Sequence, residues 1–159
     1  MPTLIVLDNT VLTNFALVKQ TEVVLRLWPA ACTTAATLAE YQVGAASGRL
    51  PLGAWSALSI VALTEEEAAF EAGLSHRLGV GERSCLAIAH GRAGVLVSDD
   101  GEARSVAQHW GVPLTGTLGI LVAAVKRHLL SRKAANAALR EMIALGYRSP
   151  VENLASLLD

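Results

Sequence analysis

Five acidic residues stand at positions where they could share a metal ion. Asp8, Asp99 and Asp100 each follow a short apolar run, and Glu40 and Glu82 lie in segments with helical patterning. Two carboxylates about 4 Å apart repel by roughly 4 kcal/mol at an effective dielectric constant near 20. If the five groups converge, some must bind protons or a cation must lie between them. Ligands that are all oxygens suit Mg²⁺ or Mn²⁺ rather than zinc.

Each acid that follows an apolar run also has a purely local interpretation. An aspartate at the N-cap of a helix accepts hydrogen bonds from backbone N–H groups and complements the helix dipole. This interpretation fits Asp8, and it fits Asp99 and Asp100, which precede a helical segment containing Arg104. An acid in a first helical turn is favourable too, which partly explains Glu82. The sequence leaves both capping and metal binding open for these residues.

The two glutamates begin or share apolar helix faces. Glu40 lies on the same face as Val43, in a stripe that is typical of burial. A capping box from Thr37 to Glu40 would put Glu40 at the third helical position, but would shorten that helix to less than about three turns. Glu82 stands one turn before Cys85, at the start of another apolar stripe. We therefore expect Glu82 to point toward the edge of a sheet.

The elements that would position these acids alternate between strands and helices. Short apolar runs predict strands at 3–7, 30–33, 58–63, 94–98 and 112–116. Helical patterns fill the intervals, at 9–19, 21–28, 36–46, 64–77, 82–90, 101–110, 117–130 and 132–145. Strands separated by helices pair in parallel through right-handed crossovers, and ligands bind at the carboxyl ends of such strands. We therefore expect an α/β, Rossmann-like three-layer fold with a central parallel β-sheet of about four to five strands flanked by helices.

Two helix starts carry capping signals. Thr64 and Glu67 fit a capping box that opens the helix toward Arg77. Ser149 and Pro150 fit an N-cap and first helical residue, which predicts a closing helix from that point.

Composition narrows the class of protein. A chain of 159 residues is most simply one domain over 1–159, with the helices at about 132–158 packed on it. Apolar residues make up 52% and charged residues 17%, a balance that argues against disorder. The formal net charge of −1 provides no global basic field for nucleic acid, so any polyanion site must depend on local arginines, lysines or metal ions.

Targeting and redox signals are few. The N-terminal run has no cationic region, and the apolar stretch at 118–125 is too short to cross a bilayer, so we expect a cytoplasmic location and no membrane partner. Cys32 and Cys85 form no C-x-x-C pair and are expected to be buried free thiols. The four histidines form no H-x₃-H pair, and neither a P-loop nor a G-x-G-x-x-G turn is present.

Several stretches together resemble the PIN-domain ribonuclease family. They are LIVLDNTVL, a lone glutamate in the helix after the second strand, GERSCLAIA and VLVSDDGEAR. The further run VPLTGTLGILVAAVKR resembles the branch that contains VapC-type toxins. The resemblance covers residues 3 to about 155 and implies a PIN-like fold.

The resemblance also implies roles for individual residues. The implied catalytic residues and metal ligands are Asp8, Glu40, Glu82 and Asp100, with Asp99 kept as a further metal ligand. The family's T-x-D motif falls on Ser98 and Asp100, and a one-residue ambiguity leaves Asp99 as the alternative acid. Thr10, Asn14 and Ser98 would support the ligands, and Arg83 and Arg104 would contact substrate phosphate or simply be solvated surface arginines.

The activity implied is hydrolysis of RNA phosphodiester bonds with one or two Mg²⁺ or Mn²⁺ ions. The chain would be the toxin of a type II toxin–antitoxin pair, a homodimer restrained by a small antitoxin that inserts a basic residue into the acidic pocket. A catalytically inactive binding module of the same fold is one alternative, with the apolar helix at 117–130 as a dimer surface. A haloacid-dehalogenase-like phosphatase is another, but Thr10 stands where that family needs a second aspartate.

Overall fold

A parallel β-sheet forms the centre of the molecule. The computed structural model describes residues 3–159. Its strands are β1 (Ile5–Leu7), β2 (Cys32–Thr34), β3 (Ser59–Val61), β4 (Val95–Val97) and β5 (Leu114–Thr115). They lie in the order β3-β2-β1-β4-β5, and every neighbouring pair is parallel. The predicted α/β three-layer fold is therefore confirmed.

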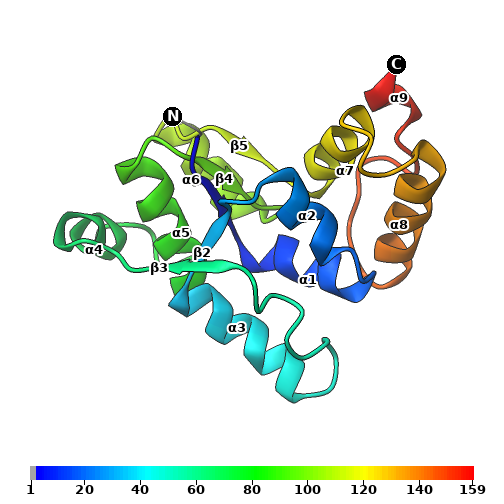
Figure 1. Cartoon of the computed structure of the whole chain (residues 1–159). Helices are drawn as coiled ribbons and strands as arrows, with labels where there is room; N and C mark the ends of the chain where they lie inside the picture. Colours follow the sequence, from blue (N-terminus) through cyan, green and yellow to red (C-terminus); the bar gives the residue numbers. More distant parts are fainter. Residues whose placement is uncertain (1–2) are drawn as a thin grey trace.

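Helices connect the strands and cover both faces of the sheet (Figure 1). The first five are α1 (Asn9–Leu17), α2 (Thr21–Leu27), α3 (Ala35–Ala46), α4 (Glu65–Ala72) and α5 (Val80–Gly91). The remaining four are α6 (Gly101–His109), α7 (Thr117–Lys126), α8 (Arg132–Ala144) and α9 (Ala155–Leu158). Across residues 3–159, none of the helices has the length and apolar character that crossing a membrane would require.

The side chains of each strand alternate between the two faces of the sheet, and each face has its own hydrophobic core. Leu7 and Val97 point to one face of the sheet, where they pack with α1, α2, α7 and α8. Val6 and Leu96 point to the other face, where they pack with α5 and α6. Successive residues of a strand face opposite sides, so these runs of branched apolar residues fill both cores at once. Leu139 and Leu154 belong to the first core, which places α8 and the segment before α9 on that side.

The topology brings distant residues to one edge of the sheet. The chain moves from β1 to β2 on one side and later returns to β4 on the other side of β1. Leu7 and Val97 are paired in register, so Asp8 and Ser98 follow at adjacent strand ends. Crevices outside the carboxyl ends of parallel strands at such a switch point are where ligands bind in open α/β sheets.

Three predicted helix boundaries are wrong. The helix from Thr64 ends at Ala72 rather than near Arg77, with Gly73 as its C-cap. The helix predicted over 117–130 ends at Lys126, and His128 beyond it has a φ of 59°, which a continuing helix does not allow. No helix begins at Pro150. The closing helix begins at Ala155, because the Ser149 hydroxyl accepts from the Val151 N–H in a local turn.

A salt bridge attaches α4 to the sheet and to the end of α5. The predicted capping box is confirmed, with Thr64 and Glu67 bonded reciprocally. The Arg92 guanidinium donates two hydrogen bonds of 2.9 Å to the Glu67 carboxylate and one of 2.8 Å to the Ala62 carbonyl. The hydrogen bonds from Arg92 lower the pKa of Glu67 to about 2.

Replacing Arg92 with alanine is expected to lower the free energy of unfolding by about 1–3 kcal/mol, because the buried Glu67 carboxylate loses its charged partner. The pKa of Glu67 is lowered in the folded chain, so the pair stabilises fully above about pH 4.5 and less as the pH falls toward 2. Urea denaturation at pH 7 and pH 3 measures both effects. Arg132→Ala, which breaks the exposed pair with Asp159, is the matched control and should change stability by less than about 1 kcal/mol.

Cys32 and Cys85 are free and buried, as predicted. Burial raises the pKa of the Cys32 thiol to about 11 and that of Cys85 to about 12. Both side chains therefore stay protonated at neutral pH, and they pack in the core between β2 and α5.

Candidate active-site cleft

Asp8 lies at the end of β1 and is fully buried. Its backbone N–H continues the sheet by donating to the Val97 carbonyl at 2.9 Å. Its carboxylate caps α1, with Oδ1 accepting from the Asn9 N–H at 2.6 Å. The local capping interpretation of Asp8 is therefore correct, but it occupies only one of the two carboxylate oxygens.

Ser98 links the ends of β1 and β4. Its hydroxyl donates to the second carboxylate oxygen of Asp8 at 2.6 Å and accepts from the Asp100 N–H at 3.1 Å. Asp100 in turn caps α6 through Oδ2, which accepts from the Ala103 N–H at 2.8 Å. One buried hydroxyl thus fixes the positions of two acids that are 92 positions apart in the sequence.

The two glutamates come from helices that meet at this edge. Helix α3 begins at Ala35 with Thr34 as its N-cap, so the alternative capping box that ended at Glu40 does not form. Glu40 instead accepts a hydrogen bond of 3.0 Å from the Gly81 N–H, in the first turn of α5. Glu82 lies in the same turn and accepts from the Gly79 N–H. The first turn of α5 therefore holds both glutamate side chains.

The acids of this edge interact electrostatically. Burial, with a smaller contribution from the carboxylates of Glu82 and Glu40, raises the pKa of Asp8 to about 7 despite the lowering effect of the hydrogen bonds from Ser98 and Asn9. Burial also raises the pKa of Glu82, and the neighbouring carboxylates of Asp100 and Glu40 act in the same direction. Asp8, Glu40, Glu82 and Asp100 thus form one group of mutually repelling charges.

Asp99 accepts hydrogen bonds through its carboxylate from residues outside the group of four acids. Its carboxylate accepts from the Asn14 amide at 3.1 Å, from the Thr117 N–H at 2.8 Å and from the Thr117 hydroxyl. Its own backbone N–H donates to the Thr10 hydroxyl at 2.9 Å. Asp99 therefore joins α1, β4 and the start of α7, and both of its oxygens already accept hydrogen bonds.

The acids border a cleft of about 780 Å³. Glu40, Glu82, Asp99 and Asp100 line it, while Asp8 lies beneath its surface. Thr10 and Asn14, predicted to support the acids, line it as well. Of the predicted phosphate-binding arginines, Arg83 contacts His76 through a hydrogen bond of 2.6 Å and is not part of the cleft. Arg104 lines a smaller neighbouring pocket instead.

The sequence did not indicate the two arginines and the tyrosine of the cleft wall. Arg49 lies just beyond α3, and Tyr147 and Arg148 lie in the connection between α8 and α9. Burial raises the pKa of Tyr147, and the Asp99 carboxylate adds to the shift, so its hydroxyl stays protonated at neutral pH. None of the three belongs to a periodic pattern or a motif, and only the tertiary fold brings them to the acids.

The donor set fits a hard divalent cation. The acids present carboxylate oxygens alone, without a thiolate or imidazole, which is the ligand chemistry of Mg²⁺ and Mn²⁺. Each oxygen of Asp8 accepts a single hydrogen bond and keeps a lone pair. Within residues 3–159, no group of three or more acidic, histidine or cysteine side chains is drawn together tightly enough to hold one ion. Burial and, to a smaller extent, neighbouring carboxylates raise the pKa values of Asp8 and Glu82, and a bound cation would favour the ionised form of both.

Comparison with known proteins identifies a family. Residues 4–159 match the family described as PIN domain. No curated protein and no solved structure matches the chain. The family match spans all five strands and every acid of the cleft.

Proposed function

The chain belongs to the PIN-domain family, whose members are generally nucleases, and we propose that it is a Mg²⁺- or Mn²⁺-dependent endoribonuclease. The substrate would be single-stranded RNA, cut by hydrolysis of a phosphodiester bond. The observation that carries the proposal is the electrostatic group of four acids at one sheet edge, in which Glu82 interacts with Asp8, Glu40 and Asp100.

Different contacts position each acid for the proposed role. Asp100 and Glu82 present carboxylates to the cleft, and Asp8 lies directly beneath them, oriented by Ser98. Glu40, on α3, is held by a hydrogen bond of 3.0 Å from the Gly81 N–H of α5. A bound Mg²⁺ or Mn²⁺ lowers the pKa of a water molecule and stabilises charge on the attacking and leaving oxygens. Asp8 and Asp100 would hold that ion, and Glu40 and Glu82 would complete or orient its ligands.

Metal addition is expected to raise both activity and stability. With Mg²⁺ or Mn²⁺ at about a hundred times its dissociation constant, the free energy of unfolding should rise by about 3 kcal/mol, because the ion binds only the folded chain. Differential scanning calorimetry and cleavage of a fluorescent single-stranded RNA, each with metal and with EDTA, measure the two effects.

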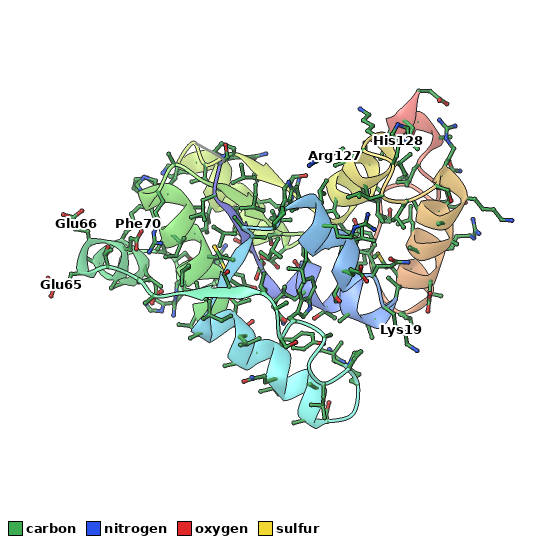
Figure 2. The ribbon with its side chains drawn as sticks, viewed as in Figure 1. Lys19, Glu65, Glu66, Phe70, Arg127 and His128 are labelled. Atoms are coloured by element: carbon green, nitrogen blue, oxygen red, sulfur yellow. The ribbon has the colours of Figure 1, made fainter. Side chains whose placement is uncertain are left out.

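The matched control is Glu65→Gln. Glu65 points away from the molecule on the outer side of α4, far from the cleft (Figure 2), so the variant should keep the full response to metal. Cleavage that proceeds equally in EDTA, or metal that leaves the melting temperature unchanged, would contradict the proposal.

Gly81→Ala is expected to reduce cleavage about 10- to 100-fold by displacing Glu40. A Cβ atom at Gly81 would lie 2.5 Å from Oε1 of Glu40, so the carboxylate must move. Stability should change little, because alanine favours the helix in which Gly81 lies. The ratio kcat/KM and the melting temperature separate the two effects. Gly73→Ala is the control, because Gly73 lies outside the cleft and its added Cβ would make only ordinary contacts of 3.6 Å or more; equal activity of both variants would be evidence against a role for Glu40.

A toxin role is the finer part of the proposal. An acidic cleft is complementary to a basic side chain, so a small antitoxin could restrain the enzyme by inserting an arginine or lysine between the acids. We also keep the homodimer and the cytoplasmic location in the proposal. The dimer surface would lie away from the inner face of α7, because Ile120, Leu121 and Ala124 are buried in the chain's own core.

A further inference from the structure

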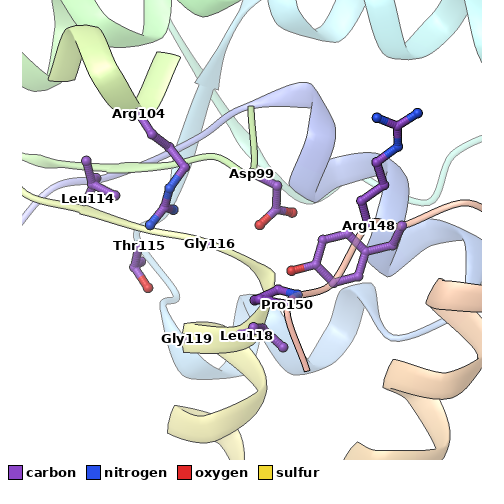
Figure 3. Close-up of a pocket in the computed structure, with 10 residues that line it drawn as sticks. Asp99, Arg104, Leu114, Thr115, Gly116, Leu118, Gly119, Arg148 and Pro150 are labelled. Atoms are coloured by element: carbon purple, nitrogen blue, oxygen red, sulfur yellow. The ribbon is translucent and has the colours of Figure 1, made fainter. Parts of the chain in front are cut away.

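A second pocket opens beside the acidic cleft. It has a volume of about 320 Å³ and shares three wall residues with the cleft, Asp99, Tyr147 and Arg148. Figure 3 shows Asp99 in the middle of the view, with Arg104 on one side of it and Arg148 on the other. The two hollows are therefore neighbours, and Asp99, Tyr147 and Arg148 belong to the walls of both.

The second pocket differs in character from the cleft. Leu114, Leu118 and Pro150 provide apolar walls, and Asp99 is its single acid. The Asp99 carboxylate accepts three hydrogen bonds from Asn14 and Thr117, which stabilise it in its present position. Four acids line the cleft, whereas the wall of the pocket combines apolar side chains with two arginines.

Two arginines flank this pocket without acidic partners. Arg104 donates to the Ser98 carbonyl at 3.0 Å, which fixes its guanidinium near Gly116. Over residues 3–159, neither Arg104 nor Arg148 lies within ion-pair distance of a carboxylate. An arginine guanidinium is planar, stacks on aromatic rings and binds phosphate through paired hydrogen bonds.

We propose that the second pocket binds one nucleotide of a single-stranded RNA, the neighbour of the nucleotide whose phosphodiester bond lies in the acidic cleft. The base enters between the apolar walls and Tyr147, and Arg148 contacts the chain where it passes from cleft to pocket. This inference rests on the proposed ribonuclease function and adds a base-binding subsite to it.

Three features favour a nucleotide as the occupant. The volume is at the small end of ligand sites, which suits a single planar group rather than a helix or peptide. Single-stranded RNA offers unstacked bases that bind to aromatic rings and guanidinium planes. The pocket and the cleft share Asp99, Tyr147 and Arg148, so an RNA chain lying across the acids would bring a flanking nucleotide close to the pocket.

Arg148→Ala tests the subsite in a binding assay that needs no turnover. Fluorescence anisotropy of a labelled single-stranded RNA 12-mer in EDTA should show about tenfold weaker binding than wild type. Arg140→Ala removes an exposed arginine of α8 that lines neither cavity, and it should bind RNA as wild type does. Equal affinities for wild type and Arg148→Ala would overturn the inference.

An abasic series distinguishes base binding from simple charge. In wild type, removing the base at one position of the 12-mer should weaken binding severalfold, and Leu118→Trp, which fills the pocket, should abolish that difference. If no position matters, and Arg148→Ala only lowers the salt slope by about 0.7, the arginine binds a phosphate and the base subsite is overturned. Metal-dependent cleavage in that case leaves the ribonuclease proposal intact. RNA binding with the expected base dependence but no cleavage supports the subsite and refutes the ribonuclease proposal.

Discussion

Asp8→Asn is expected to reduce metal-dependent RNA cleavage at least about 100-fold and to flatten the pH dependence of stability. Asp8 is the buried acid that Ser98 orients beneath the cleft, and asparagine keeps its shape without its charge. The loss of activity should therefore come without unfolding.

The pH effect follows from the raised pKa of Asp8. That pKa is about 7 in the folded chain and 3.8 for an ordinary aspartate, so between these values the folded state binds the proton more strongly. Stability in EDTA should therefore fall as the pH rises from 4 to 7 and stay low above that, by up to about 4 kcal/mol for this group. Glu82 contributes in the same direction. Urea denaturation across this pH range measures the effect.

In the Asp8→Asn variant, stability should still fall as the pH rises from 4 to 7, but only by the smaller amount that Glu82 contributes. Glu66→Gln is a suitable control, because Glu66 points outward from α4 (Figure 2) and should leave both cleavage and the pH profile unchanged. Full activity in Asp8→Asn would remove Asp8 from the proposed metal site, and an unchanged pH profile would show that its pKa is not raised.

Asp100→Asn is expected to lose mainly cleavage activity, whereas Asp99→Asn is expected to lose mainly stability. Asp100 caps α6 with one oxygen, and asparagine is an equally good N-cap, so stability should change by less than about 0.5 kcal/mol. Cleavage should fall at least about 100-fold, because Asp100 belongs to the group of acids around Glu82.

Asp99→Asn should instead lower the free energy of unfolding by about 1–3 kcal/mol, because the new amide group would face donors from Asn14 and Thr117. Its cleavage should fall far less than that of Asp100→Asn. Thermal denaturation and kcat of both variants, measured at one saturating metal concentration, give the comparison. The reverse pattern would identify Asp99 as the metal ligand and Asp100 as a structural cap.

General rules for parallel β-sheets predict from the sequence where these acids lie. Asp8 and Ser98 end two apolar runs, and parallel pairing places such ends together. Asp8 and Asp100 can each cap a helix and also bind a metal ion, because a carboxylate that caps with one oxygen has a second oxygen. The sequence leaves the choice between Asp99 and Asp100 open, and the hydrogen bonds between Asp99 and Thr117 that favour Asp100 as the proposed ligand form only in the folded chain.

The segment around Pro150 does not follow its local helix signals. The segment at Ser149 and Pro150 carries helix-starting residues, yet it runs as a turn along the pocket, where Pro150 and Arg148 form the wall. Tertiary contacts override such local signals. Arg49 and Tyr147 were missed for a related reason, because they lie outside any pattern and reach the cleft only through the packing of α3 and α8.

The strand order also has a consequence for biosynthesis. Asp8 and Glu40 leave the ribosome early, but β4, Ser98 and Asp100 are made much later, and the residue that anchors Asp99 is later still at Thr117. A nascent chain that ends before β4 has neither the partner strand of β1 nor the hydroxyl that orients Asp8. The nascent chain of the proposed ribonuclease therefore could not attack the message from which it is being translated until most of that message has been read.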